Sequence, residues 1–89
     1  MKDIVISKLP EDTIEKKGIL NWPVWEKEVS YFDWEYDSDE ECLVLEGEVD
    51  VETEHGIFTI KQGDFVTFRK GLRCKWNVKI PIRKHYNFP

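Results

Sequence analysis

The side chains able to do chemistry are few, and most of them stand alone. Cys42 and Cys74 lie far apart without a Cys-x-x-Cys spacing, which argues against a disulfide framework and a zinc ribbon and favours reduced thiols. His55 lies beside a turn glycine, and His85 lies near the end of the sequence. Because neither has a ligand constellation around it, we expect both histidines to be exposed or structural.

Residues 37–41 form an acidic run, Asp-Ser-Asp-Glu-Glu. A calcium-binding loop that began at Asp37 would need glycine where Cys42 stands, so a solvated charge run is the better interpretation. The net charge is −5, and the acidic residues are concentrated here. Since nucleic-acid binding needs a positively charged surface, we expect no nucleic-acid partner.

The elements that must position these residues are mainly β-strands. From Asn21 onward, aromatic and β-branched residues are interrupted by turn signals about every eight to twelve positions, as in sandwiches and barrels. Residues 29–36 alternate so that Phe32, Trp34 and Tyr36 share one wholly aromatic face. With an edge strand over 4–6, the pattern predicts about eight strands. The further strands are expected over 42–45, 49–51, 57–60, 65–68, 72–78 and 82–88.

Turn residues and helix signals mark the connections between these strands. Gly47 predicts a bulge or sharp bend at a barrel corner, and His55-Gly56 predicts a hairpin turn. Residues 11–17 have helical propensity, with Asp12 as the candidate cap and Gly18 as the stop. We therefore expect at most one or two helical turns near the N-terminus.

Two segments resemble the motifs of the cupin family. Residues 40–47, Glu-Glu-Cys-Leu-Val-Leu-Glu-Gly, resemble the end of the first motif, and residues 63–71 resemble the second, with both glycines at the proper separation. Residues 18–25 and 83–86 are similar to the small cupin family related to ureidoglycine aminohydrolase and an ethanolamine-utilisation protein. The resemblance implies an all-β, cupin-type barrel (jelly roll) of antiparallel strands, with residues 1–89 as a single domain.

In that family a metal is usually held by a His-x-His pair, the motif glutamate and a third histidine. The glutamate corresponds to Glu40. The paired histidines correspond to Trp34 and Tyr36, or to Asp33 and Glu35 if the gap is one residue longer. Neither alignment supplies an imidazole, which is the commonest ligand for zinc, copper, iron and nickel.

The third histidine of the motif corresponds to Cys74. Only a carboxylate and a thiol remain, so we expect no cofactor and no metal ligands of the usual kind. A three-ligand site built from Glu40, Cys42 and Cys74 is the alternative, since Cys42 shares strand parity with Glu40.

The resemblance and the strand parity together predict an aromatic pocket with one carboxylate. Glu40 is a candidate general acid or base or a hydrogen-bond anchor, and Cys74 is a candidate nucleophile unless it is only a small buried hydrophobe. The aromatic residues would either bind a ligand by stacking or simply fill the core. The candidate catalytic residues are thus Glu40 and Cys74, and the candidate ligand-binding residues are Trp25, Trp34, Tyr36 and Trp76.

Two functions remain open. The first is a cupin enzyme of unassigned reaction, or a binder, that takes a small polar metabolite in the barrel pocket. The second is a non-catalytic binding or assembly module, in which a partner copy could cover the outer face of residues 43–45 to form a homodimer. A change of Glu40 to glutamine that spares the fold and abolishes binding would favour the first.

Size and composition set the remaining bounds. A chain of 89 residues with 40% hydrophobic and 35% charged residues fits one globular domain. It has no apolar run long enough to span a bilayer and no signal-peptide pattern, so we expect a cytoplasmic location and no membrane partner. Few Gln and Asn among many Glu and Lys are typical of thermophilic proteins.

Overall fold

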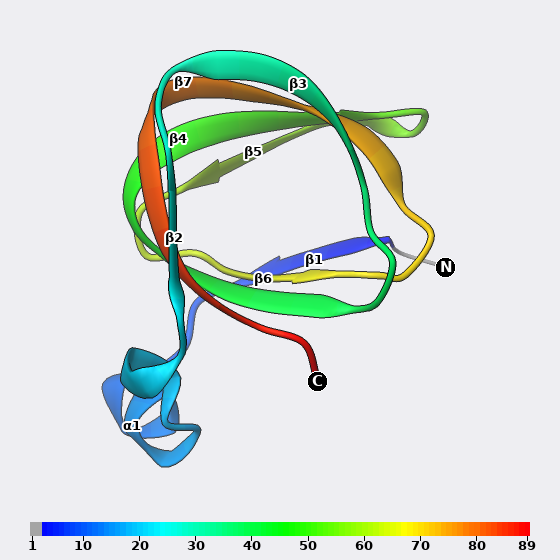
Figure 1. The fold of residues 1–89 in the computed structure, drawn as a ribbon. Helices are drawn as coiled ribbons and strands as arrows, with labels where there is room; N and C mark the ends of the chain where they lie inside the picture. The colour runs from blue at the N-terminus through cyan, green and yellow to red at the C-terminus, as the bar shows by residue number, and fades with distance from the viewer. Residues whose placement is uncertain (1–2) are drawn as a thin grey trace.

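Seven antiparallel strands of one sheet make up most of the computed structural model, which describes residues 3–89 (Figure 1). One short helix, α1 (Glu11–Lys16), and a 3-10 turn over Ile19–Asn21 follow the first strand. The strands are β1 (Ile4–Ser7), β2 (Val24–Lys27), β3 (Ser30–Glu35), β4 (Glu40–Thr53), β5 (Gly56–Lys61), β6 (Phe65–Phe68) and β7 (Arg73–Asn87). The predicted all-β class with a short N-terminal helical turn is confirmed.

The two long strands, β4 and β7, form the centre of the sheet. They pair with each other over most of their length, and each uses its other edge for two shorter strands in turn. β7 pairs with β3 along its first half and with β2 along its second half. β4 pairs with β6 and then with β5, and β1 closes the edge beside β6. The sheet thereby curls into the barrel that Figure 1 shows end-on, as the turn pattern predicted.

Each long strand is bent rather than broken. Gly47 has φ +96°, and the register between β4 and β7 shifts on both sides of it, so the predicted bend is confirmed. A Cβ at Gly47 would clash with the carbonyl oxygen of Pro81, which shows how closely the two strands approach at the bend. The prediction of separate strands before and after Gly47, and before and after Pro81, was wrong because each strand continues through its bend. Four predicted strands are thus two, and β2 was not predicted. Residues 3–89 therefore contain seven strands rather than about eight.

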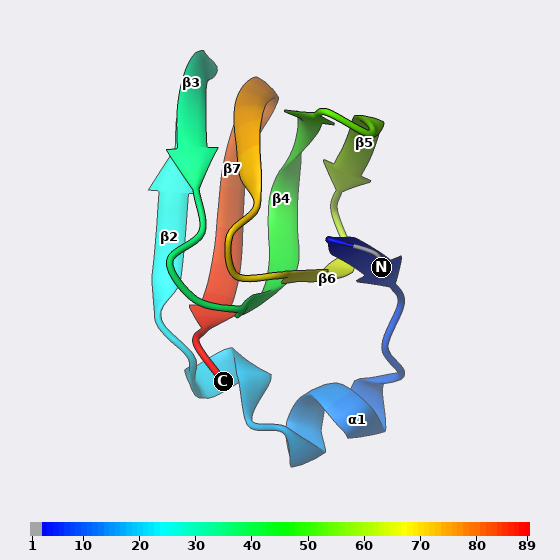
Figure 2. The ribbon, with the colours of Figure 1, turned by 90° about the vertical axis from the view of Figure 1, so that its right-hand side faces the viewer.

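The helical segment lies at one end of the barrel, below the sheet in Figure 2. Asp12 was wrongly predicted as the helix cap. It lies inside the first turn of α1, where the cap position belongs to Pro10 and no side chain caps the helix. Gly18, with φ +66°, ends the helix as predicted because it adopts a left-handed conformation that other residues rarely take.

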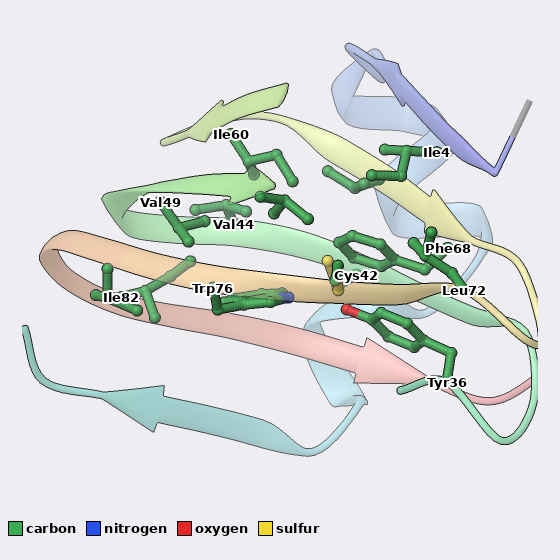
Figure 3. Close-up of a cluster of buried hydrophobic side chains, with 14 residues drawn as sticks. Ile4, Tyr36, Cys42, Val44, Val49, Ile60, Phe68, Leu72, Trp76 and Ile82 are labelled. Atoms are coloured by element: carbon green, nitrogen blue, oxygen red, sulfur yellow. The ribbon is translucent and has the colours of Figure 1, made fainter. Parts of the chain in front are cut away.

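Apolar side chains form two separate clusters. The larger one fills the barrel and is drawn in Figure 3. The smaller one joins Ile19 of the 3-10 turn to Leu43 of β4 and Phe65 of β6 on the outside of the sheet. The outer face of residues 43–45, which the alternative function offered to a partner copy, is covered by the chain's own N-terminal segment. No helix in the described range is long and apolar enough to cross a membrane.

Candidate functional site

A cavity of about 200 Å³ lies between β2, β3, β7 and the start of β4. Its walls are aromatic except for one carboxylate and one ammonium group. The lining residues are Trp25, Phe32, Trp34, Tyr36, Glu40, Trp76, Lys84, Tyr86 and Phe88. Typical small-molecule pockets measure roughly 300–1,000 Å³. The cavity is smaller than this range, so it is suited to a small molecule with a single ring.

Strand alternation places the aromatic walls. Phe32 and Trp34 point to the same side of β3, and Tyr36 continues this alternation just after the strand, as the sequence predicted. Phe32 lies opposite Trp76 of β7, and their rings stack with centroids 6.2 Å apart. Trp34 is 47% exposed and Tyr36 only 3%, so the wall extends from the mouth of the cavity into the barrel.

Inside the cavity, Glu40 and Lys84 form a buried ion pair. Lys84 Nζ lies 2.6 Å from Glu40 Oε2, and each residue is 5% exposed. The ammonium also lies over two indole rings, 5.0 Å from the centroid of Trp25 and 4.8 Å from that of Trp76. Because these contacts combine Coulomb attraction, a hydrogen bond and cation–π attraction, they compensate for the loss of hydration that burial imposes on both charges.

Two further polar atoms in this region have no hydrogen-bond partner within the described residues. They are Tyr36 Oη and Trp76 Nε1, both fully shielded from solvent. Burial, followed by the negative charge of Glu40, raises the pKa of Tyr36 well above its usual value. The phenol is therefore neutral and can donate a hydrogen bond, as the indole N–H can.

Cys74 does not line this cavity. It lies opposite Trp34 in the sheet and borders a more open hollow, which Trp34, half-buried Glu52 of β4 and exposed Glu54 of the following turn also line. Burial raises the pKa of its thiol to about 11, which leaves little thiolate at neutral pH. Cys74 and Glu40 therefore do not line the same cavity, whereas Trp25, Trp34, Tyr36 and Trp76 line it together with Glu40.

The three-ligand alternative is not assembled either. Cys42 is 1% exposed, and burial raises the pKa of its thiol to about 12. In residues 3–89 no group of three or more His, Cys, Asp or Glu side chains is placed to hold a metal ion. His85 Nδ1 lies 2.9 Å from the carbonyl oxygen of Trp22, and His55 is exposed at the β4–β5 turn, so both histidines are placed as expected.

Sequence reasoning missed Lys84, the residue that supplies the charge partner of Glu40. The signal was present in the parity of β7, where Ile82, Lys84 and Tyr86 alternate and all three contribute to the barrel interior or its cavity. A lysine between two such positions predicts a buried ammonium that needs a carboxylate. Phe32, Tyr86 and Phe88 also belong to the cavity wall and were not named as site residues.

Comparison with known proteins agrees with the sequence motifs and the barrel. A family model described as the EutQ-like cupin domain matches residues 14–86. A DUF861 family protein from Thermotoga maritima is 50% identical, with a TM-score of 0.93, and the match covers 97% of this chain and 99% of that one. No curated protein matches.

Two other solved structures share the fold with lower identity. The EutQ protein of Clostridium difficile is 24% identical with a TM-score of 0.67, and the match covers 74% of this chain and 53% of that one. A DUF861 family protein of unknown function from Pseudomonas syringae is 29% identical with a TM-score of 0.64, covering 71% of this chain and 28% of that one. This chain thus corresponds to only part of these longer proteins.

Proposed function

The chain belongs to the EutQ-like cupin domain family, and we propose that its barrel binds a small polar metabolite in the aromatic cavity, with Glu40 as the anchor. The observation that carries this proposal is the buried Glu40–Lys84 pair at 2.6 Å inside an otherwise aromatic cavity. Replacing a buried ion pair by apolar residues of similar volume is often neutral or stabilising. A pair that faces a cavity is therefore better explained by what it binds than by stability.

The position of Glu40 supports the same proposal. Its Oε2 accepts the hydrogen bond of Lys84, and that is the only hydrogen bond recorded for this side chain in residues 3–89. A carboxylate beside an ammonium group and a neutral phenol is also equipped to exchange a proton with a bound molecule. Cys74 has no part in the proposal because its thiol borders a different surface.

The alternative function, an assembly module that dimerises through residues 43–45, has lost its structural argument. Ile19 of the same chain packs against Leu43, and Leu9, Ile14 and Trp22 pack around them. A partner copy would have to displace this cluster before it could reach the face. A homodimer and a cytoplasmic location stay predictions from the sequence.

The four tryptophans allow a direct test of binding. Trp25, Trp34 and Trp76 line the cavity, whereas Trp22 packs in the outer cluster beside the helical segment. In a nitrogen–proton NMR spectrum each indole N–H gives its own signal. A panel of small neutral, acidic and basic ring compounds should contain ligands that shift the three cavity signals and leave the Trp22 signal in place.

Glu40→Gln tests the anchor, and Glu41→Gln is the matched control because its side chain points to the other side of β4. A ligand found in the panel should bind weakly to Glu40→Gln and normally to Glu41→Gln, with both variants folded. Shifts that involve Trp22 as much as the cavity tryptophans, or equal binding by both variants, would contradict the proposal.

A further inference from the structure

The charged pair in the cavity leaves hydrogen-bonding capacity unused. An ammonium group has three N–H donors, and Lys84 gives one of them to Glu40 Oε2. Glu40 Oε1 has no hydrogen-bond partner among residues 3–89, and neither does the rest of the Lys84 ammonium. The pair therefore presents a donor and an acceptor side by side.

Two buried polar atoms of the barrel interior, Tyr36 Oη and Trp76 Nε1, are less available to a ligand, because both are fully shielded from solvent. Figure 3 shows the hydroxyl of Tyr36 and the indole nitrogen of Trp76 pointing toward one another in the barrel interior. The indole N–H can only donate, whereas the phenol oxygen can accept from it, so these two groups do not set the requirement for the ligand. A ligand that satisfies the Glu40–Lys84 pair needs one good acceptor for Lys84 and one N–H donor for Glu40.

The charges argue against an ionic ligand. The place where an aromatic cage would take a ligand's ammonium group is filled by Lys84, which lies over Trp25 and Trp76. A cationic ligand would therefore meet a like charge. A carboxylate ligand would lie beside Glu40 and compete with it for the same ammonium. A neutral group avoids both repulsions.

The walls favour a flat molecule. Trp25 and Trp76 meet edge to face at 5.7 Å, and Phe32 stacks on Trp76, so the cavity offers ring faces at fixed angles. A volume of about 200 Å³ allows a single ring with one substituent. A planar ligand can stack on these rings while its polar edge meets the ion pair.

We propose that the cavity recognises a neutral planar carboxamide or lactam, whose carbonyl oxygen accepts from Lys84 while its N–H donates to Glu40. This inference rests on the proposed function and names the ligand class for the same site. The amide edge places an acceptor and a donor next to each other, as the pair requires. Both hydrogen bonds are charge-assisted and shielded from water, which makes them strong.

Four probes of nearly equal size separate the possibilities: benzamide, benzoate, benzylammonium and toluene. Affinities are measured by titration, with the indole signals of Trp25, Trp34 and Trp76 as the readout and that of Trp22 as the internal control. Benzamide should bind about tenfold or more tightly than each of the others, since charge-assisted hydrogen bonds contribute that much. Benzoate or benzylammonium binding as tightly as benzamide would overturn the inference.

The same titrations distinguish failure of the inference from failure of the proposed function. If toluene binds as well as benzamide, the cavity holds ligands but does not recognise the amide, and only the inference fails. If none of the probes shifts the cavity signals, the proposed function fails as well. Glu40→Gln should weaken benzamide about tenfold and leave toluene unchanged. An equal effect on both probes would mean that Glu40 only shapes the cavity, which also overturns the inference.

Discussion

Replacing Lys84 by methionine should destabilise the barrel far more than any change to an exposed lysine. The substitution keeps an unbranched side chain of similar length and removes only the ammonium group. Glu40, which is 5% exposed and 2.6 Å from that group, is then left without a charge partner. The ring faces of Trp25 and Trp76 that held the ammonium remain, and a ring face does not compensate a negative charge as it does a positive one.

The expected magnitude follows from the burial of both partners. Breaking a buried ion pair on one side costs about 3–5 kcal/mol, because an uncompensated charge stays in a place of low polarity. Small domains have total stabilities of about 5–15 kcal/mol. For a domain of this size, each kcal/mol lowers Tm by about 4–8 °C. The Lys84→Met variant should therefore melt at least about 12 °C below the parent protein.

The change on the other side of the pair, Glu40→Gln, should lower the free energy of unfolding less than Lys84→Met does. The ammonium of Lys84 keeps its contacts with Trp25 and Trp76, each of about 0.5–2 kcal/mol, and the glutamine carbonyl can still accept its hydrogen bond. The double variant with both changes contains no buried charge at this position. It should be more stable than Lys84→Met alone, because the lone carboxylate has been removed.

Urea unfolding followed by tryptophan fluorescence gives these free energies, and the four proteins form a double-mutant cycle. Lys75→Met is the matched control, because Lys75 lies on the same strand but is exposed; its effect should stay within about 0.5 kcal/mol. A loss below about 1 kcal/mol for Lys84→Met, or a double variant less stable than Lys84→Met, would refute the reasoning.

Three other predictions concern the bend and two titrating groups. Gly47→Ala should lower the free energy of unfolding by about 1–3 kcal/mol more than Gly71→Ala does. The backbone φ is similarly positive at both sites, but only at Gly47 would the added Cβ clash with other atoms. Equal losses in urea unfolding would contradict this. Burial raises the pKa of Cys42 to about 12, whereas the unfolded thiol ionises near its ordinary pKa of about 8.5. The free energy of unfolding should thus fall as the pH rises above about 9, and it should fall less steeply in Cys42→Ala. Parallel plots of stability against pH for the two proteins would contradict this prediction. Hydrogen bonds from Lys79 and then Thr59 lower the pKa of Asp50, so Asp50→Asn should lose a little stability at neutral pH and none in acid, as unfolding curves at both pH values would show.

The features of the site that depend only on residues close together in the sequence were predictable from the sequence. Alternation over residues 29–36 placed Phe32, Trp34 and Tyr36 on one face, because side chains in a strand alternate whatever the rest of the fold does. Cupin motif spacing brought Glu40 to the same cavity. The roles of these residues in binding are still predictions, which the NMR titrations address.

Features that depend on contacts between distant segments were not predictable in the same way. Gly47 and Pro81 each look like the end of a strand when read alone. They lie against each other in the folded sheet, where the bend of one strand accommodates the bend of the other. Likewise, the outer face of Leu43 looked available to a partner because nothing local shows that Ile19 returns to cover it.

The Glu40–Lys84 pair also bears on the chemistry that this barrel can perform. Where the cupin resemblance places a metal beside the motif glutamate, the structure places the ammonium of Lys84 beside Glu40. Both are cations that can neutralise the carboxylate, but a metal accepts lone pairs from a ligand, whereas an ammonium group only donates hydrogen bonds. An ammonium is also fixed to the chain and cannot be exchanged or removed by a chelator. The residues of this cavity therefore supply hydrogen bonding, proton exchange and aromatic stacking, and a ligand must match that set.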